Sequence, residues 1–307
     1  MERVVPDGNS CFYIERRMIM KPKLHLIIAM VIFGSIGLII RGIPFSSAQI
    51  AMIRGVIGSA FLTIAAIAMK KKPTFKGARR NFNYLIASGA ALGFNWILLF
   101  EAYRYTSITN ATLSYYFAPV IVVFLSPFLL KEKLTLRKVL CVLAAIIGMF
   151  FVAGTGGDGS SGRNELAGIG FGLGAAFLYA FVVIFNKLIK EMGGLDITII
   201  QLTVASLILI PYVLLQGTVP LSLLNTGAII KLVLVGLLNT GVAYLLYFSS
   251  VQKLESQTVA IFSYIDPISA VVMSAIFLGE NLSGQQLVGG ILILGGAFIS
   301  GRKQQVK

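Results

Sequence analysis

An internal repeat constrains this chain more than any other feature. Residues 114–135, SYYFAPVIVVFLSPFLLKEKLT, align without a gap with residues 262–283, FSYIDPISAVVMSAIFLGENLS. The offset is 148 residues, and ten identities share it: Gly93, Phe100, Tyr116, Pro119, Ser126, Leu130, Glu132, Leu134, Gly148 and Phe150 fall on Gly241, Phe248, Tyr264, Pro267, Ser274, Leu278, Glu280, Leu282, Gly296 and Phe298. The chain is therefore two diverged copies of one unit.

The composition indicates the solvent in which these units fold. Hydrophobic residues make up 57% of the chain and charged residues 12%, which is too little polar surface to cover a protein of 307 residues in water. Continuous apolar stretches of bilayer-crossing length indicate helices rather than the alternating strands of a barrel. We predict an all-α polytopic membrane protein with ten transmembrane helices, five in each repeat. Within about 3 residues, the predicted spans are 24–41, 46–69, 83–103, 108–130, 138–154, 166–186, 195–215, 227–250, 256–278 and 284–301.

The distribution of basic residues predicts the orientation of the helices. The net charge is +14, but Lys and Arg of membrane proteins collect in cytoplasmic loops. If the N-terminus is cytoplasmic, 21 of the 26 Lys and Arg lie on that side, four lie on the opposite side, and Arg54 lies within a span. Both termini are therefore predicted to be cytoplasmic, and the loops account for the charge without nucleic-acid binding.

Five crossings in each unit are an odd number, so the two units must have opposite orientations. Inverted repeats of this kind place a substrate site between them. The predicted organisation is a cytoplasmic N-terminal extension at 1–22 with Met18 and Met20 as alternative starts, a first repeat at 23–154, an external Gly/Ser linker at 155–165, a second repeat at 166–301 and a cytoplasmic tail at 302–307.

Each repeat carries one motif: a helix with a mid-span proline, a short Glu-x-Leu-Thr/Ser turn and a glycine-containing helix. Its residues are Pro119, Glu132, Leu134 and Gly148 in the first copy and Pro267, Glu280, Leu282 and Gly296 in the second. Over about residues 24–301, the chain resembles the EamA branch of the drug/metabolite transporter superfamily. The resemblance implies a ten-helix basket around a central cavity, which works by alternating access and usually exports amino acids or other small metabolites.

The turn within the motif has a physical explanation. Ser283 and Gln286 are spaced as a capping box at a helix N-terminus, and Thr135 stands in the corresponding position of the first copy. Glu132 and Glu280 lie just before these helix starts, where the helix dipole favours negative charge. Both copies keep the glutamate although they face opposite sides of the membrane, so we interpret it as structural.

Residues that differ between the copies are better candidates for binding an asymmetric ligand. Asp266 is the only acidic residue at mid-membrane depth, and its counterpart is Ala118. A carboxyl group there is costly and is functional by default: it could carry a coupling proton or bind the ammonium of an amino-acid-like solute. The alternative is an acid that is protonated or held by an internal partner and that orders the helix break before Pro267.

Arg54 is the only basic residue deep within a predicted span. Its counterpart is Gln201, because the repeat is fainter in this upstream part and its offset is shorter by one residue. It could bind a substrate carboxylate, pair with Asp266 or a helix-end carbonyl, or extend its stem toward the interface. We favour a structural role, because extension toward the nearby interface costs little. Adjacency of Arg54 and Asp266 would make them a coupling or gating pair.

Polar and aromatic residues near mid-membrane form a third group of candidates. The predicted substrate-binding residues are Asn95, Trp96, Tyr115, Tyr179, Asn239, Tyr244 and Asp266. The sole tryptophan, Trp96, lies outside the interfacial belt where tryptophan is enriched, which favours a cavity wall. The alternative is packing of each ring between helices. Tyr116 and Tyr264 occur in both copies and are interpreted as structural, and Pro119 and Pro267 are predicted to bend their helices.

These features favour a carrier over other classes of protein. The single histidine and single mid-span carboxyl form no catalytic or metal-binding set, so an enzyme, a cofactor and a metal are not expected. No pore-lining ring or selectivity filter indicates a channel. We predict export of a small, amino-acid-like metabolite across the cytoplasmic membrane, with efflux of organic cations or drugs as the alternative. Substrate identity, direction, coupling ion and oligomeric state stay open, with a homodimer among the options.

Overall fold

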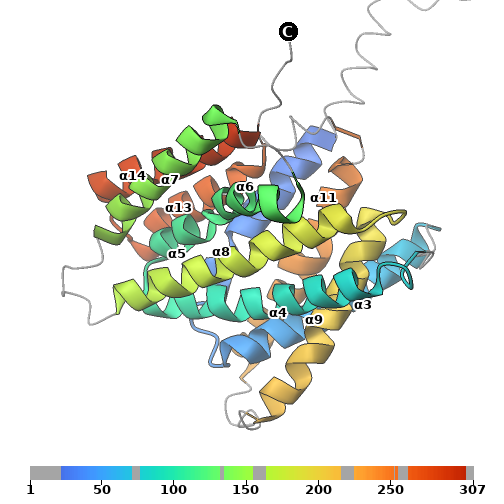
Figure 1. The fold of residues 1–307 in the computed structure, drawn as a ribbon. Helices are drawn as coiled ribbons and strands as arrows, with labels where there is room; N and C mark the ends of the chain where they lie inside the picture. Colours follow the sequence, from blue (N-terminus) through green and yellow to red (C-terminus); the bar gives the residue numbers. More distant parts are fainter. Residues whose placement is uncertain are drawn as a thin grey trace, which may run out of the picture.

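The computed structural model describes residues 22–70, 77–131, 135–154, 164–215, 225–251, 253–254 and 262–301. This part of the chain forms helices and contains no strand (Figure 1), which confirms the predicted all-α class. The elements are the helical segment Pro22–Ile40 ending in α2 (Ile36–Ile40), α3 (Ser47–Ala68), α4 (Phe82–Tyr105), α5 (Ile108–Tyr115), α6 (Ala118–Leu129), α7 (Leu136–Gly154), α8 (Glu165–Leu188), α9 (Gly194–Leu215), α10 (Thr226–Gly236), the π-helix η3 (Leu237–Val242), α11 (Ala243–Val251), α13 (Ile265–Leu278) and α14 (Gly284–Gly301).

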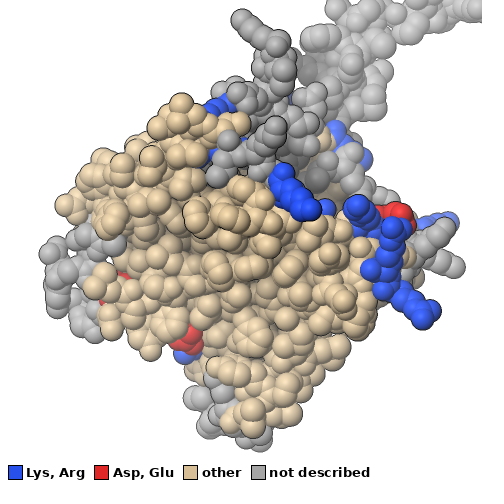
Figure 2. All heavy atoms as spheres, in the orientation of Figure 1, with Lys and Arg blue, Asp and Glu red and all other residues tan. Residues whose placement is uncertain are grey.

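Seven helical segments are long and apolar enough to cross a membrane. They are Pro22–Ile40, Ser47–Ala68, Phe82–Tyr105, Ile108–Leu129, Glu165–Leu188, Gly194–Leu215 and Thr226–Ser250, and Ile265–Leu278 and Gly284–Gly296 are shorter apolar helices. Figure 2 shows a broad face made almost entirely of uncharged residues, with Lys and Arg gathered toward one edge. The described part is therefore a multi-pass membrane protein, whereas the number of ten spans stays a prediction.

Three membrane segments are interrupted along their length. The segment Pro22–Ile40 is interrupted by a turn at Ser35, before α2. The segment Ile108–Leu129 is divided into α5 and α6, and Pro119 stands in the first turn of α6, where its missing N–H is tolerated. The segment Thr226–Ser250 contains η3. In the second repeat, α13 begins with Asp266 and Pro267 in its first turn. Irregular backbone of this kind places helix ends and polar side chains at membrane depth.

Corresponding helices of the two repeats pack against each other. The pairs are α3 with α9, the segment Ile108–Leu129 with α13 through its first half α5, and α7 with α14, and Figure 1 shows α7 and α14 side by side. A Cβ atom built at Gly55 of α3 would lie 3.6 Å from Ser206 Cβ, and one at Gly58 would lie 3.6 Å from Leu202 Cδ1. The residue numbers rise on α3 as they fall on α9, so the two helices are antiparallel. Antiparallel packing of equivalent helices is the arrangement that an inverted repeat produces.

Contacts between helix ends sort into two opposite edges. At the first edge, Arg80 before α4 pairs with Glu191 after α8, at 3.1 Å. At the second edge, Thr106 after α4 donates a hydrogen bond to Glu165 at the start of α8. The packed helices α4 and α8 therefore run antiparallel from one edge of the molecule to the other.

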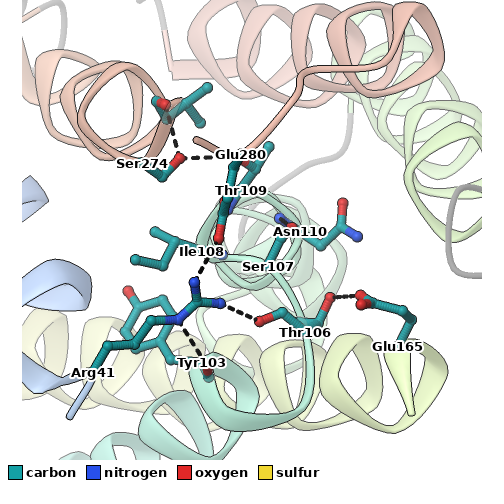
Figure 3. A network of polar contacts seen from close by, with 11 residues as sticks. Arg41, Tyr103, Thr106, Ser107, Ile108, Thr109, Asn110, Glu165, Ser274 and Glu280 are labelled. Carbon is teal, nitrogen blue, oxygen red and sulfur yellow. Dashed lines mark hydrogen bonds and ion pairs between the residues drawn. The ribbon is translucent and has the colours of Figure 1, made fainter. Parts of the chain in front are cut away.

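A polar network joins both repeats at the second edge (Figure 3). Arg41 Nη1 donates to Glu280 Oε1 at 2.8 Å, and Arg41 Nη2 donates to the Thr106 carbonyl at 2.8 Å. Glu280 also accepts the backbone N–H groups of Ile108 at 3.0 Å and Thr109 at 3.3 Å, which begin α5. The glutamate of the second repeat thus caps a helix of the first repeat.

This position differs from the one expected from the sequence, which placed the charge of Glu280 at the N-terminus of the helix that follows it. That helix is capped instead by the predicted capping box, which is confirmed: Ser283 Oγ accepts the Gln286 N–H at 3.1 Å, and Gln286 Oε1 accepts the Ser283 N–H at 2.9 Å. The cap of α14 is thus supplied by Ser283 and Gln286, whereas the Glu280 carboxylate bonds to the start of α5. Its counterpart Glu132 lies outside the described residues.

Substitution of Glu280 tests the contribution of this network to stability. Glu280→Gln removes the charge from the Arg41 pair and from the α5 cap, and a hydrogen bond to a charged group contributes about 1.5–3 kcal/mol. We expect a free energy of unfolding lower by about that amount, measured in detergent micelles. Glu191→Gln is the matched control, because the Arg80–Glu191 pair is 69% and 68% exposed and such pairs contribute about 0–1 kcal/mol. Equal stability of both variants would contradict the assignment.

Candidate functional site

Arg54 of α3 lies inside the bundle with 4% of its surface exposed. Its Nε donates to Thr240 Oγ1 at 3.0 Å, and its Cζ lies 4.1 Å from the centre of the Trp96 ring. The expected extension of the stem toward the interface is therefore wrong. The hydroxyl and the indole hold the guanidinium within the protein, and a cation over an indole face is stabilised by about 0.5–2 kcal/mol.

Its counterpart Gln201 has different surroundings. Gln201 Nε2 donates to Ser88 Oγ at 2.8 Å and to Asn186 Oδ1 at 2.6 Å, so protein acceptors use both of its N–H groups. Arg54, by contrast, has no carboxylate at ion-pair distance among the described residues. A buried cation without an anion is costly, which distinguishes Arg54 from a residue that serves packing alone.

Asp266 occupies the first turn of α13, where the helix dipole favours a negative charge. Its Oδ2 accepts a hydrogen bond from the Tyr116 hydroxyl at 2.5 Å. No ion pair joins it to Arg54 or to another basic residue of the described ranges, so the two are not the adjacent pair that the sequence left open. The sequence assigned Tyr116 and Tyr264 the same structural role. Tyr116 nevertheless contacts the Asp266 carboxyl, whereas the first-repeat counterpart of Asp266 is Ala118, which has no carboxyl.

Tyrosine rings connect Arg54 with Asp266. The ring centres of Tyr115 and Tyr179 are 5.5 Å apart. The ring centre of Tyr115 also lies 5.8 Å from that of Tyr116, the residue that donates to Asp266, and Arg54 lies near Tyr115 and Tyr244. These side chains form what we name the central cluster: Arg54, Trp96, Tyr115, Tyr116, Tyr179, Tyr244 and Asp266. The cluster draws residues from both repeats.

The central cluster is enclosed by helices but is not sealed. Tyr115, Tyr116, Tyr244 and Asp266 keep an intermediate exposed fraction, and Tyr179 is 37% exposed. The cluster thus combines one guanidinium, one carboxyl, several phenol hydroxyls and aromatic faces at an accessible surface. This combination suits a small ligand that carries charge of both signs beside an apolar body.

Two predicted binding residues, Asn95 and Asn239, form hydrogen bonds between helices. Both are fully buried. Asn95 Nδ2 donates to the Ala175 carbonyl of α8 at 2.6 Å, and Asn239 Nδ2 donates to Ser35 Oγ at 3.0 Å and to the Ile32 carbonyl at 2.5 Å. Both amides therefore join one helix to another through Nδ2, while the Oδ1 atom of each is buried without a hydrogen-bond partner among the described residues.

Thr240 and Tyr103 were missed by the sequence analysis. Thr240 contacts Arg54, and Tyr103 interacts electrostatically with Arg54 and Asp266. The repeat contained a signal for both, because the counterpart of Thr240 is Leu92 and that of Tyr103 is Val251. The difference between copies that singled out Asp266 applies equally to them.

The described part of the chain offers no basis for a metal centre, since His, Cys, Asp and Glu residues form no group of three there. Within the central cluster, the Tyr116 hydroxyl donates a hydrogen bond to the Asp266 carboxyl.

The fold and this cluster define a multi-pass membrane transporter. The sequence model of the EamA-like transporter family matches residues 21–154 and again residues 166–302. The chain belongs to the EamA-like transporter family.

Individual relatives agree with this membership. "Uncharacterized transporter YxxF" of Bacillus subtilis (strain 168) is 30% identical over 284 residues, covering 92% of this chain and 90% of that protein. "Probable amino-acid metabolite efflux pump" of Salmonella typhimurium is 27% identical over 185 residues, covering 57% of this chain and 61% of that protein. A crystal structure of a protein with 17% identity shares the fold with a TM-score of 0.63, covering 91% of this chain and 96% of the other.

The fluorescence of Trp96 provides a test of the cluster geometry, because it is the sole tryptophan of the chain. Arg54→Gln removes the cation that lies 4.1 Å from the indole. We expect a changed emission maximum or quantum yield in purified protein excited where tyrosine does not absorb. Arg41→Gln, which removes an arginine at the second edge, is the control and should leave the spectrum unchanged. An unaltered spectrum of Arg54→Gln would contradict the contact.

Proposed function

We propose that this transporter moves a small, amino-acid-like metabolite out of the cell by alternating access and is not an enzyme. The observation that carries the proposal is the central cluster, in which a guanidinium and a carboxyl of different repeats are separated by aromatic rings. A zwitterion carries the complementary charges. Its carboxylate matches Arg54, its ammonium matches Asp266, and its side chain fits among the rings.

Arg54 supplies the strongest argument for an anionic group on the substrate. A buried cation without a paired anion is costly, and the hydroxyl of Thr240 does not neutralise it. A substrate carboxylate would do so through a bidentate, charge-assisted pair. Trp96 would hold the guanidinium in place between transport cycles.

Asp266 suits either of two tasks in this cycle. Its carboxyl can bind the substrate ammonium, or it can exchange a coupling proton while Tyr116 donates to its other oxygen. In either task, Asp266 and Arg54 together would couple substrate binding to the conformational change. The helix starts at Pro119 and Pro267 would supply the bends beside them.

The network at the second edge fits an alternating-access cycle. Arg41 and Glu280 join the two repeats there, and α5 begins at the same place. A passage that opens between the repeats at this edge would have to break these contacts. The pair would therefore hold this edge closed in the described conformation.

Export across the cytoplasmic membrane is supported by the relative from Salmonella typhimurium, whose description names amino-acid metabolite efflux. The distribution of basic residues supports cytoplasmic termini, because this orientation places 21 of the 26 Lys and Arg on the cytoplasmic side. We assign the first repeat to residues 23–154 and the second to residues 166–301. With cytoplasmic termini, the second edge of the molecule is external.

Cysteine labelling tests that orientation. In a background of Cys11→Ser and Cys141→Ser, we introduce Arg79→Cys beside α4 or Thr226→Cys at the start of α10, both at exposed positions. A membrane-impermeant maleimide should label the cysteine at 226 in intact cells, and the one at 79 only after permeabilisation. The reverse pattern would place the termini outside.

Efflux of organic cations is the second candidate, because Asp266 and the surrounding tyrosine rings alone would bind a cation. The two candidates differ in the need for Arg54. A cation substrate is repelled by this guanidinium, whereas a zwitterion requires it.

Transport by proteoliposomes with three matched probes separates these candidates. The probes are labelled phenylalanine, phenethylamine, which lacks the carboxylate, and 3-phenylpropanoate, which lacks the ammonium. We expect wild-type protein to transport phenylalanine. Arg54→Gln and Asp266→Asn should each reduce this transport by about 100-fold or more, which corresponds to a loss of about 3 kcal/mol. Trp96→Ala should abolish it. Arg80→Gln, at an exposed position, is the control.

The outcomes are distinct. Retained phenylalanine transport in Arg54→Gln and Asp266→Asn would remove the site assignment. Transport of phenethylamine that is insensitive to Arg54→Gln would favour cation efflux. Growth resistance of overexpressing cells to amino acids and toxic analogues extends the test to other side chains.

A further inference from the structure

The π-helix η3 brings one hydroxyl to the edge of the Arg54 guanidinium. Thr240 Oγ1 donates to the Val235 carbonyl, five residues earlier, at 3.0 Å. The same oxygen accepts the Arg54 Nε–H at 3.0 Å. Since its proton is directed at the backbone of α10, the hydroxyl presents a lone pair to the arginine. Single turns of π-helix inside α-helices frequently occur at functional sites.

Gly58 permits this approach. It lies one turn after Arg54 on the same face of α3. A Cβ atom at Gly58 would lie 2.9 Å from Thr240 Cβ, closer than a real contact allows. The absence of a side chain at this position therefore lets η3 reach the depth at which Thr240 meets Arg54.

A guanidinium can be contacted at its Nε–H group, over its face, and along the edge that carries Nη1 and Nη2. The first two of these are occupied in Arg54. Nε is bonded to Thr240, and Cζ lies over the Trp96 ring, 4.1 Å from its centre and 5.5 Å from the centre of the Phe100 ring. The remaining edge carries Nη1 and Nη2, which make no hydrogen bond to a described residue. Two parallel N–H groups on one edge match the two oxygens of a planar carboxylate.

We propose that Thr240 is a positioning residue that fixes Arg54 by its Nε, so that the Nη1 and Nη2 edge receives a planar carboxylate of the substrate. This inference rests on the proposed function in one respect, namely that Arg54 contacts the substrate. It adds that the anion is bound end-on by this edge, and that a residue of the second repeat sets the orientation of an arginine of the first.

The first test needs no ligand. Thr240→Val keeps the shape of the side chain and removes the acceptor, whereas Thr240→Ser keeps the acceptor. Because Arg54 lies over the sole tryptophan, we expect the emission of Trp96 to change in Thr240→Val and to match wild type in Thr240→Ser. Equal thermal unfolding midpoints of the two variants would show that the difference is local. Gly58→Ala, which would displace η3, should reproduce the spectrum of Thr240→Val.

The second test measures binding through the same fluorescence. We expect Thr240→Val to weaken binding of 3-phenylpropanoate by about 10-fold or more, corresponding to loss of one hydrogen bond to a charged group. Thr240→Ser should restore the wild-type affinity. Binding of phenethylamine, which has no carboxylate, should be the same in all three proteins.

The outcomes separate this inference from the function on which it rests. If Arg54→Gln abolishes binding of 3-phenylpropanoate while Thr240→Val keeps wild-type affinity, the positioning role is overturned and the proposed function stands. If Arg54→Gln binds the anion normally, the contact between Arg54 and the substrate fails. If wild-type protein binds none of the probes, the proposed substrate class fails, and an unchanged Trp96 spectrum in ligand-free Thr240→Val would by itself overturn the positioning role.

Discussion

Antiparallel packing of corresponding helices across the two repeats is the interaction on which the rest of this structure depends. On α3, Gly55 faces Ser206 of α9, and Gly58 faces Leu202 of α9 and Thr240 of η3. Because glycine allows helix backbones to approach closely, this face is buried against protein rather than lipid. Arg54 lies on the same face. Its charge is therefore held where it contacts a hydroxyl and an indole instead of the interface.

Interruptions of the membrane helices supply the polar groups that meet Arg54. Tyr115 and Tyr116 lie at the break between α5 and α6, Thr240 belongs to η3, and Asp266 stands in the first turn of α13. Irregular backbone at membrane depth is tolerated only where protein or an aqueous cavity surrounds it. These polar residues of the central cluster therefore lie where the membrane helices are interrupted, because polar side chains and irregular backbone both require surroundings other than lipid.

The two repeats have kept their fold and diverged in their polar residues. Tyr116 and Tyr264 are equivalent, but only Tyr116 faces a carboxyl, because the counterpart of Asp266 is Ala118. Arg54 and Gln201 are equivalent, but only the glutamine has both N–H groups bonded to protein acceptors. A symmetric scaffold with an asymmetric cluster suits a ligand that has no symmetry itself. The network of Arg41 and Glu280 at the second edge is likewise built from both repeats.

The sequence by itself determined the helical class and the capping box of Ser283 and Gln286, because run length and cap spacing are local properties. It also determined the duplication, because a repeat is visible when the sequence is aligned with itself. It also singled out Asp266 and Arg54, since charge at membrane depth is rare. Only the tertiary structure decided that Glu280 caps α5, that Thr240 holds Arg54, and that amides such as Asn95 tie helices together. These contacts join residues that are 80 to 186 positions apart in the chain. They depend on how helices cross and where they break, which periodicity does not encode.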